Sequence, residues 1–355
     1  MTVGIILGNI DTGGAQRVAI TLATWLNEHH HKAVLIVLSN SKWKAYTIEG
    51  IETAFLENIY KGKSIKNRIQ LFNEENAIDE YLVMDVPMCI YVIPALKRSK
   101  ARIVVSERSD PRHAKIKLPV KIMSRLLMSQ ADGFVFQTEE AKNYYKRLAN
   151  KSIVIPNPVM EIPVIANRRS NCERKKEIVT AGRLIPAKNH KMLLSAFKKI
   201  SSSYPDYKLI IYGDGLLLSE LKSVSKDLGI DDKVEFPGSV NDLHERIKES
   251  ELFVMTSDFE GMPNALMEAM AMGLTCISTD CPCGGPKQLI SDGENGYLIP
   301  VGDISACAEK IEYTLTHKEE ADIIADRAMG VREKYGKDTI CAKWLSYLQS
   351  IYEKC

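Results

Sequence analysis

Residues 3–39 read VGIILGNIDTGGAQRVAITLATWLNEHHHKAVLIVLS, and this stretch predicts the fold of the first half of the chain. An apolar run at 3–10 leads through a Gly-Gly turn into an amphipathic helical pattern, and a second apolar run follows at 32–39. Continuous apolar strands joined by a helix are typical of a parallel sheet covered on both faces. The stretch therefore predicts a β-α-β unit.

The alternation of apolar runs and helical patterns continues along the chain, with one interruption. A polar, charged segment at 166–176 follows three closely spaced prolines and predicts an interdomain linker. A length of 355 residues also suits two domains. We expect Rossmann-like domains at 1–165 and 166–337, then a terminal helix at 338–355 with one apolar stripe. The predicted strands are 3–10, 32–39, 101–106, 133–138 and 152–157, then 177–183, 207–214, 233–238, 252–257, 275–280 and 296–300.

Composition excludes several classes of protein. The most apolar window, 81–96, is short and broken by Asp85 and two prolines, so it predicts no membrane span. The amino-terminal residues lack a basic start and predict no signal peptide. Eight cysteines occur without CxxC or paired zinc spacing, which indicates reduced thiols in a cytoplasmic protein and no structural metal.

Two loops carry candidate phosphate-binding groups. Ligands of doubly wound sheets bind beyond the carboxyl ends of the strands. Gly13 and Gly14 lie in such a loop, where backbone N–H groups can approach an anion, although a tight turn alone would also explain them. In AGRLIPAKNH (181–190), Arg183 and Lys188 are the pair expected around a diphosphate; the alternative is a solvated basic loop.

The stretch DFEGMPNALMEAMAMGLT (258–275) places two carboxylates around a helix start. We expect Pro263 in the first helical turn, with the next three N–H groups directed at a ligand. Glu260 and Glu268 can accept hydrogen bonds from the vicinal hydroxyls of a sugar or ribose. The alternative is two surface glutamates, but Glu268 has apolar neighbours on all sides and therefore needs a partner.

Taken together, AGRLIPAK, EGMPNALME and the early GGAQRV resemble glycosyltransferase family 4, whose members are retaining enzymes of the α/β GT-B fold. Further matching segments are IPNPV (155–159), YGDG (212–215), FPGSV (236–240) and SDGENGYLIPVGD (291–303), so the resemblance spans the chain. It implies two facing Rossmann-like domains with a donor cleft between them, and a carboxyl-terminal helix that crosses back to the first domain.

The resemblance also implies roles for matching residues. Arg183 and Lys188 would clamp the donor diphosphate, Glu260 would bind the transferred sugar, and Glu268 would bind the ribose. Arg108 stands where many relatives carry a sugar-contacting histidine, and Gln288 where a glutamate is frequent, so Gln288 is not expected to be catalytic. The remaining expected donor contacts are Gly13, Gly14, Ser239, Val240, Met262, Pro263, Asn264, Ala265 and Leu266, with Ser239 and Val240 facing the nucleobase.

The expected mechanism uses neither metal nor cofactor. No Asp-x-Asp motif occurs, so Arg183, Lys188 and helix N–H groups would stabilise the leaving diphosphate. The resemblance implies that the donor phosphate takes the proton of the acceptor. The acceptor attacks the donor sugar from the same face from which the leaving group departs. We expect a UDP-linked hexose or N-acetylhexosamine in preference to GDP-mannose. The competing classes are a sugar-nucleotide 2-epimerase and a non-catalytic sugar-nucleotide-binding subunit.

Positive charge gathers in the first half of the chain, where a basic segment also carries apolar residues. The segment KIKLPVKIMSRLLMS (115–129) predicts a helix on an anionic membrane surface or one that guides a lipid diphosphate; the alternative is a solvated helix with its apolar side in the core. No aromatic residues alternate with the basic ones, which argues against nucleic acid as a partner. We expect an undecaprenyl-diphosphate-linked saccharide acceptor at the inner face of the cytoplasmic membrane, with a contact patch of Arg112, Lys115, Lys117, Lys121 and Arg125.

Overall fold

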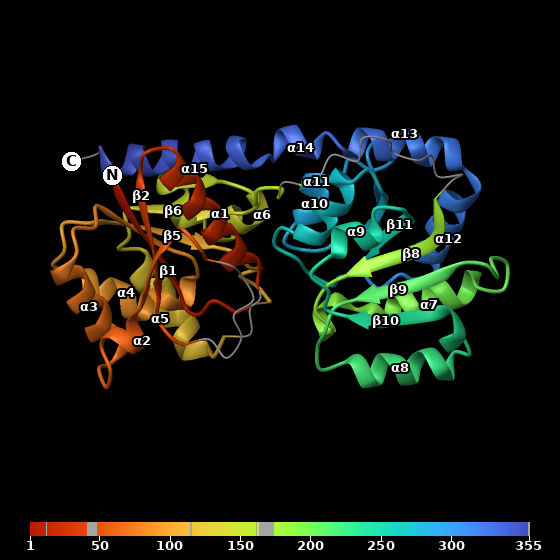
Figure 1. The fold of residues 1–355 in the computed structure, drawn as a ribbon, viewed down its shortest axis with the longest axis horizontal. Helices are drawn as coiled ribbons and strands as arrows, with labels where there is room; N and C mark the ends of the chain where they lie inside the picture. The colour runs from red at the N-terminus through yellow and green to blue at the C-terminus, as the bar shows by residue number, and fades with distance from the viewer. Residues whose placement is uncertain (12, 41–47, 114–115, 161, 163–173, 354–355) are drawn as a thin grey trace. The chain divides into compact units, whose positions relative to one another are not determined.

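The computed structural model describes residues 1–11, 13–40, 48–113, 116–160, 162 and 174–353 (Figure 1). The chain divides into two compact units: unit 1 is Met1–Pro158 with Lys337–Cys355, and unit 2 is Val159–Gly336. The expected boundary at 165/166 and most of the expected linker lie outside the described residues. The end of that segment is not a linker, because Lys175 begins a strand and the buried Arg174 donates to the carbonyls of Ser250 and Gly273, at 2.9 and 2.7 Å.

Unit 1 is built on a sheet of seven described strands in the order β3-β2-β1-β4-β5-β6-β7, with every pair parallel. The β-branched runs predicted from the sequence form five of them. Strands β3 and β4 were not among the predicted runs, because β3 is short and β4 shares one apolar window with the helix that follows it. The bounds are β1 Thr2–Leu7, β2 Lys32–Val37, β3 Glu52–Phe55, β4 Glu80–Val83, β5 Arg102–Glu107, β6 Gly133–Phe136 and β7 Ser152–Val154.

The last helix of the chain belongs to unit 1 (Figure 1). Its residues Ile340, Trp344, Leu348 and Ile351 form the buried stripe that their spacing predicts. The Trp25 indole donates to Asp338 at 2.7 Å, so the helix is also tied to α1 by a hydrogen bond. The helices of unit 1 are α1 Gly14–Glu28, α2 Leu56–Ile59, α3 Ile65–Glu75, α4 Cys89–Leu96, α5 Leu118–Met128, α6 Glu139–Tyr144 and α15 Lys337–Tyr352.

Unit 2 contains a second sheet, of six described strands in the order β10-β9-β8-β11-β12-β13, and its pairs are also parallel. The order places the connections that follow β10, β8 and β11 along one edge of the sheet, since the carboxyl ends of parallel strands share an edge. The bounds are β8 Lys175–Ala181, β9 Lys208–Tyr212, β10 Val234–Gly238, β11 Ser250–Met255, β12 Thr275–Thr279 and β13 Tyr297–Ile299.

Helices cover the sheet of unit 2 and complete its core, in which Leu193, Phe197 and Leu252 are fully buried. No helix among the described residues is long and apolar enough to cross a bilayer. The helices of unit 2 are α7 His190–Ile200, α8 Leu218–Asp227, α9 Leu243–Ile247, α10 Asn264–Ala271, α11 Gly285–Leu289, α12 Ile304–Thr316, α13 Lys318–Ala328 and α14 Val331–Lys334.

Candidate active site

The loops that follow β8 and β11 are tied to each other by hydrogen bonds. The Asp258 N–H donates to the Ala187 carbonyl at 2.9 Å, and the Asn189 side-chain amide donates to the Asp258 carboxylate at 2.7 Å. Asn189 adopts a left-handed conformation with φ of 43° and caps α7 by accepting from the Met192 N–H. These bonds fix the end of the AGRLIPAK segment against the start of the EGMPNALME segment.

This arrangement brings two predicted catalytic residues into contact. The Lys188 ammonium forms an ion pair with the Glu260 carboxylate, whose Oε1 also accepts from the Ser257 hydroxyl at 2.7 Å. The two side chains are only 22% and 13% exposed, so water screens the pair less than it screens a surface pair. A cation and a carboxylate held together at the carboxyl edge of a sheet can contact phosphate and hydroxyl groups of one ligand.

A close backbone contact supports the Glu260 loop from behind. Glu260 donates its N–H to the Pro282 carbonyl at 2.6 Å, and its own carbonyl accepts from the Cys283 N–H at 2.7 Å. A Cβ atom on Gly285 would lie 1.7 Å from the carbonyl oxygen of Gly261. Glycine is therefore required at position 285, in the CGGP turn (283–286), because α11 begins directly against this loop.

Helix α10 begins one residue later than predicted. Pro263 is its N-cap, with an extended ψ of 100°, rather than a residue of the first helical turn. The first i→i−4 bond runs from the Met267 N–H to the Pro263 carbonyl at 3.1 Å, so the N–H groups at 264–266 precede the intrahelical bonds. Met262 is buried beside this start.

Glu268 lies in the buried interior of α10, as its apolar neighbours predict. Leu266, Met267, Ala269 and Met270 are at most 1% exposed and Glu268 itself is 5% exposed. Its Oε2 accepts from His244 Nε2 on α9 at 2.8 Å, so the buried carboxylate has the partner that it requires. The sequence did not predict His244, because NDLHERIKES resembles an ordinary solvated helix.

The candidate nucleobase loop is fixed to the loop that carries Arg183. The Ser239 N–H donates to Asp214 Oδ2 at 2.9 Å, and the Asp214 carbonyl accepts from the Leu184 N–H at 2.9 Å. Ser239 is exposed and Val240 is half-buried. The Arg183 side chain is exposed as well, and no described acidic side chain forms an ion pair with it. Asp214, like Ser257 and Asn189, was not predicted as part of the site.

His190 lies behind the ion pair, at the start of α7. The side chain is 4% exposed, and neither ring nitrogen has a hydrogen-bond partner among the described residues, although the ring faces the Arg183 backbone. Burial, together with the Lys188 ammonium, lowers the pKa of His190 to about 4, although the Arg183 backbone and Glu260 oppose the change. His190 is therefore neutral at physiological pH.

Unit 1 holds the other predicted donor contacts. Gly13 is the N-cap of α1 and Gly14 its first residue, which places both glycines between β1 and the helix. Arg108 follows β5, and its guanidinium donates to the Asn157 side chain and to the Ile155 carbonyl, and lies 5.8 Å from the ring centroid of Trp344. These contacts anchor Arg108 within unit 1, and its role toward a donor stays a prediction.

Two acidic side chains at the ends of β4 and β5 were not predicted. Glu107 ends β5, is 3% exposed and accepts from the Ser109 hydroxyl at 2.7 Å and the Tyr145 hydroxyl at 3.1 Å. Burial raises its pKa. Asp85, which follows β4, has its pKa raised to about 7 by burial and by the charge of Glu107. The carboxyl edge of this sheet thus carries protonatable carboxyl groups.

Helix α5 presents its apolar residues to solvent. Leu118, Ile122, Met123 and Leu126 are 68, 51, 50 and 62% exposed, so the alternative that placed this side of the helix in the core is wrong. Lys117 is the N-cap of this helix and Lys121 lies within it, while Lys115 is outside the described residues. The helix instead buries Ser124 and Met128.

A hollow of about 810 Å³ lies beside α5 and contains basic groups. Arg112, Arg125, Lys146 and Arg147 line it together with apolar residues of α5. The Arg125 guanidinium contacts the Tyr144 hydroxyl and lies 4.8 Å from that ring's centroid, which holds it at the wall of the hollow.

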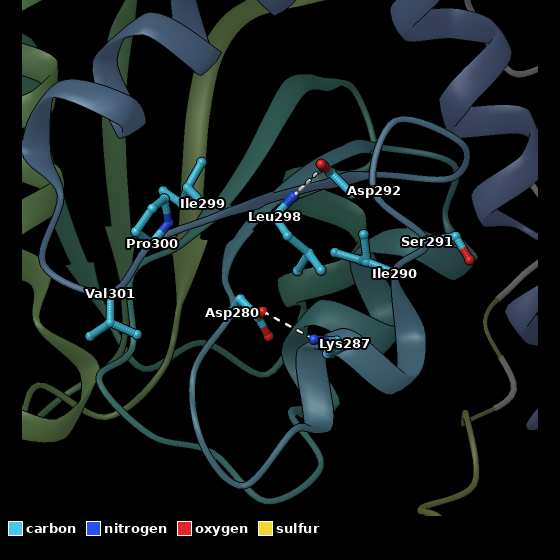
Figure 2. A pocket seen from close by; sticks show the side chains of 9 residues that line it. All are labelled: Asp280, Lys287, Ile290, Ser291, Asp292, Leu298, Ile299, Pro300 and Val301. Carbon is cyan, nitrogen blue, oxygen red and sulfur yellow. Dashed lines mark hydrogen bonds and ion pairs between the residues drawn. The ribbon is translucent and has the colours of Figure 1, made fainter.

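A second hollow, of about 860 Å³, lies beside β12 and β13 and is not lined by any predicted site residue (Figure 2). Lys287 pairs with Asp280 at 3.6 Å, and Asp292 accepts from the Leu298 N–H at 2.9 Å, both within its wall. Among the described residues, no three or more His, Cys, Asp or Glu side chains are grouped so as to hold a metal ion.

The family model "Glycosyl transferases group 1" matches residues 164–330, which is nearly all of unit 2 and includes every predicted site residue of that unit. Residues 164–330 thus form a domain of the glycosyl transferase group 1 family. The resemblance to glycosyltransferase family 4 is confirmed, and the similar structures confirm the α/β GT-B fold.

Similar proteins extend the likeness over the whole glycosyltransferase chain. A Haemophilus influenzae protein described as an uncharacterized glycosyltransferase is 27% identical over 354 residues, covering 98% of this chain and 99% of its own. A Campylobacter jejuni α-1,4-N-acetyl-D-galactosaminyltransferase, named for the acceptor GalNAc-α-(1→4)-GalNAc-α-(1→3)-diNAcBac-PP-undecaprenol, is 26% identical over 364 residues, covering 99% of each chain. The crystal structure of Anabaena Alr3699/HepE in complex with UDP and glucose has a TM-score of 0.85 at 17% identity, with 99% of this chain and 100% of that chain covered.

Proposed function

We propose that this glycosyltransferase moves a hexose or N-acetylhexosamine from a UDP-sugar to a saccharide carried on a polyprenyl diphosphate, with retention of configuration and without a metal ion. The Campylobacter jejuni relative is named for an undecaprenol diphosphate acceptor, and the Anabaena structure is described as a complex with UDP and glucose. The observation that carries the proposal is the Lys188–Glu260 pair, with Glu268 in the next helix, at the carboxyl edge of the family-defining unit.

In this proposal the donor lies along that edge. Arg183 and Lys188 bind the diphosphate together with the N–H groups at the start of α10, and Glu268 binds the ribose hydroxyls. Glu260 binds hydroxyls of the transferred sugar, and the Ser239–Val240 loop contacts the base. Charge-assisted hydrogen bonds of this kind contribute roughly 1.5–3 kcal/mol each.

The proposed reaction exchanges one glycosidic bond for another at the anomeric carbon. The bond from that carbon to the diphosphate oxygen breaks, and a bond to the acceptor hydroxyl oxygen forms on the same face. The hydroxyl proton passes to the departing phosphate, so no protein base is needed. Arg183 and Lys188 stabilise the negative charge that develops on the diphosphate.

Helix α5 supports a peripheral membrane contact for the acceptor. Its four exposed apolar side chains and the neighbouring basic residues form the combination that binds an anionic interface. The basic hollow beside it suits the diphosphate of the lipid-linked acceptor.

The function is tested by incubating the protein with UDP- and GDP-sugars and a bacterial lipid extract, with and without EDTA. Glycolipid formed in the presence of EDTA supports the proposal. An epimerised sugar nucleotide formed without acceptor would indicate a 2-epimerase instead, and binding without turnover a non-catalytic partner subunit. Near-normal turnover by Glu260→Ala or Arg183→Ala would contradict the role given to that residue.

The membrane contact has a separate test, sedimentation with vesicles of phosphatidylglycerol and phosphatidylcholine. The double change Ile122→Glu and Leu126→Glu is expected to abolish sedimentation with vesicles and to leave the fold intact, since both side chains are exposed. Ile323→Glu is the matched control, because Ile323 is 52% exposed on α13 of unit 2. Equal sedimentation of the double variant and the control would refute the contact.

A further inference from the structure

The environment of Glu268 identifies a residue that no motif pointed to. Glu268 lies in the connection after β11, whereas His244 lies in the connection between β10 and β11. Their contact, at 2.8 Å between Nε2 and Oε2, joins positions 24 residues apart. The side chains are 26% and 7% exposed, so the pair is shielded far more than the exposed ion pairs of the same helix.

The contact restricts how the carboxylate can turn. A carboxylate oxygen accepts, so the imidazole donates from Nε2, and this bond fixes the plane of the carboxyl group at the end of a flexible side chain. Each carboxylate oxygen has two acceptor positions, so Glu268 can accept from His244 and from ligand hydroxyls at once. A fixed acceptor binds a diol without first losing rotational freedom.

His244 also follows the candidate nucleobase loop closely. It lies five residues after Ser239, in the same connection, and α9 begins at Leu243. The segment that contacts the base therefore also carries the group that orients the carboxylate.

We propose that His244 is a positioning residue, which holds the Glu268 carboxylate in the orientation that binds the ribose hydroxyls of the donor nucleotide. The inference rests on the proposed function, in which Glu268 binds ribose. In metal sites, substitution of the residues that orient a ligating side chain in this way lowers metal affinity or activity by roughly 10- to 100-fold.

The test compares binding of UDP, 2′-deoxy-UDP and 3′-deoxy-UDP by calorimetry, and of the GDP series in parallel. Wild-type protein is expected to lose roughly 10- to 100-fold in affinity when the hydroxyl contacted by Glu268 is removed. His244→Ala is expected to bind the diphosphate about tenfold more weakly and to discriminate no more than a few-fold against the deoxy analogue. His244→Gln, whose amide can donate from a similar position, is expected to restore the discrimination.

Two further variants separate the possible outcomes. Arg246→Ala removes an exposed ion pair with Asp242 from the same helix and should leave the discrimination unchanged. If Glu268→Ala abolishes the discrimination but His244→Ala keeps the wild-type ratio, the positioning role is refuted and the ribose role stands. If Glu268→Ala keeps the ratio, or the wild type binds neither diphosphate, the proposed function fails and the inference fails with it.

Discussion

Replacing Glu80 by glutamine is expected to stabilise unit 1 at neutral and alkaline pH. The side chain begins β4, is 0% exposed, and neither carboxylate oxygen has a hydrogen-bond partner among the described residues. Burial, together with the negative charges of Asp132 and Asp79, raises the pKa of Glu80 from 4.5 to about 8, although the positive charge of Arg102 opposes the change. The carboxyl group is therefore protonated in the folded protein at pH 7.

The sign of the effect follows from proton binding. Between pH 4.5 and 8 the unfolded chain ionises Glu80 while the folded chain keeps it neutral, so the free energy of unfolding falls as the pH rises. The free energy of unfolding falls by about 1.36 kcal/mol for each pH unit between 4.5 and 7, so by pH 7 it has fallen by about 3 kcal/mol. Glutamine does not ionise and removes this loss, whereas any cost of burying its amide does not depend on pH.

Thermal unfolding of the wild type and Glu80→Gln at pH 5 and pH 7.5 measures the effect. The difference in Tm between the two proteins is expected to grow by about 6–12 °C over this interval, at about 2–4 °C for each kcal/mol. Glu140→Gln, an exposed position on α6, makes the same charge change and should show no such growth. A Tm difference for Glu80→Gln that does not change with pH would refute the reasoning.

Three other changes test the site of unit 2. Between pH 6.5 and 4 the free energy of unfolding of the wild type should fall by about 3 kcal/mol, because His190 gains a proton only in the unfolded state. His190→Leu should remove this fall. Urea unfolding of both proteins at both pH values checks this, and an equal fall in the two proteins would contradict it. Gly285→Ala should cut transfer activity at least tenfold, because its Cβ would displace the Gly261 carbonyl; wild-type activity would exclude that contact. Lys188→Ala leaves Glu260 without its cation and should lower kcat/KM by roughly 10- to 100-fold, measured with saturating acceptor.

Local pattern predicted the fold well, because continuous apolar runs such as 252–257 form strands of parallel sheets almost independently of their surroundings. Strand β4 escaped prediction because its run merges with that of α4. The amphipathic pattern of α5 showed that its apolar residues share one face. Whether that face packs in the core or meets solvent depends on the neighbouring elements, which the pattern does not show. The exposure of Ile122 and Leu126 could therefore be found only from the structure.

Within the site, residues could be predicted where one short segment supplies both the motif and its geometry. Arg183, Lys188 and Glu260 each stand in a loop directly after a strand, so parallel pairing alone places them at one edge. His244 could not be predicted in this way, because its contact with Glu268 depends on the path of the chain from β10 to β11. The one-residue error at Pro263 has a local cause, since proline fixes φ and leaves ψ open.

The inclusion of α15 in unit 1 has a consequence for the order in which the protein is made. Residues 159–336 form unit 2 as one continuous segment, whereas the first 158 residues lack the Trp344 stripe and the Asp338 contact until α15 has been synthesised. Unit 2 can thus complete its fold on the ribosome before unit 1 does. A premature stop near residue 337 would leave unit 2 whole and expose the apolar surface of unit 1, so the damage would appear at the opposite end of the sequence.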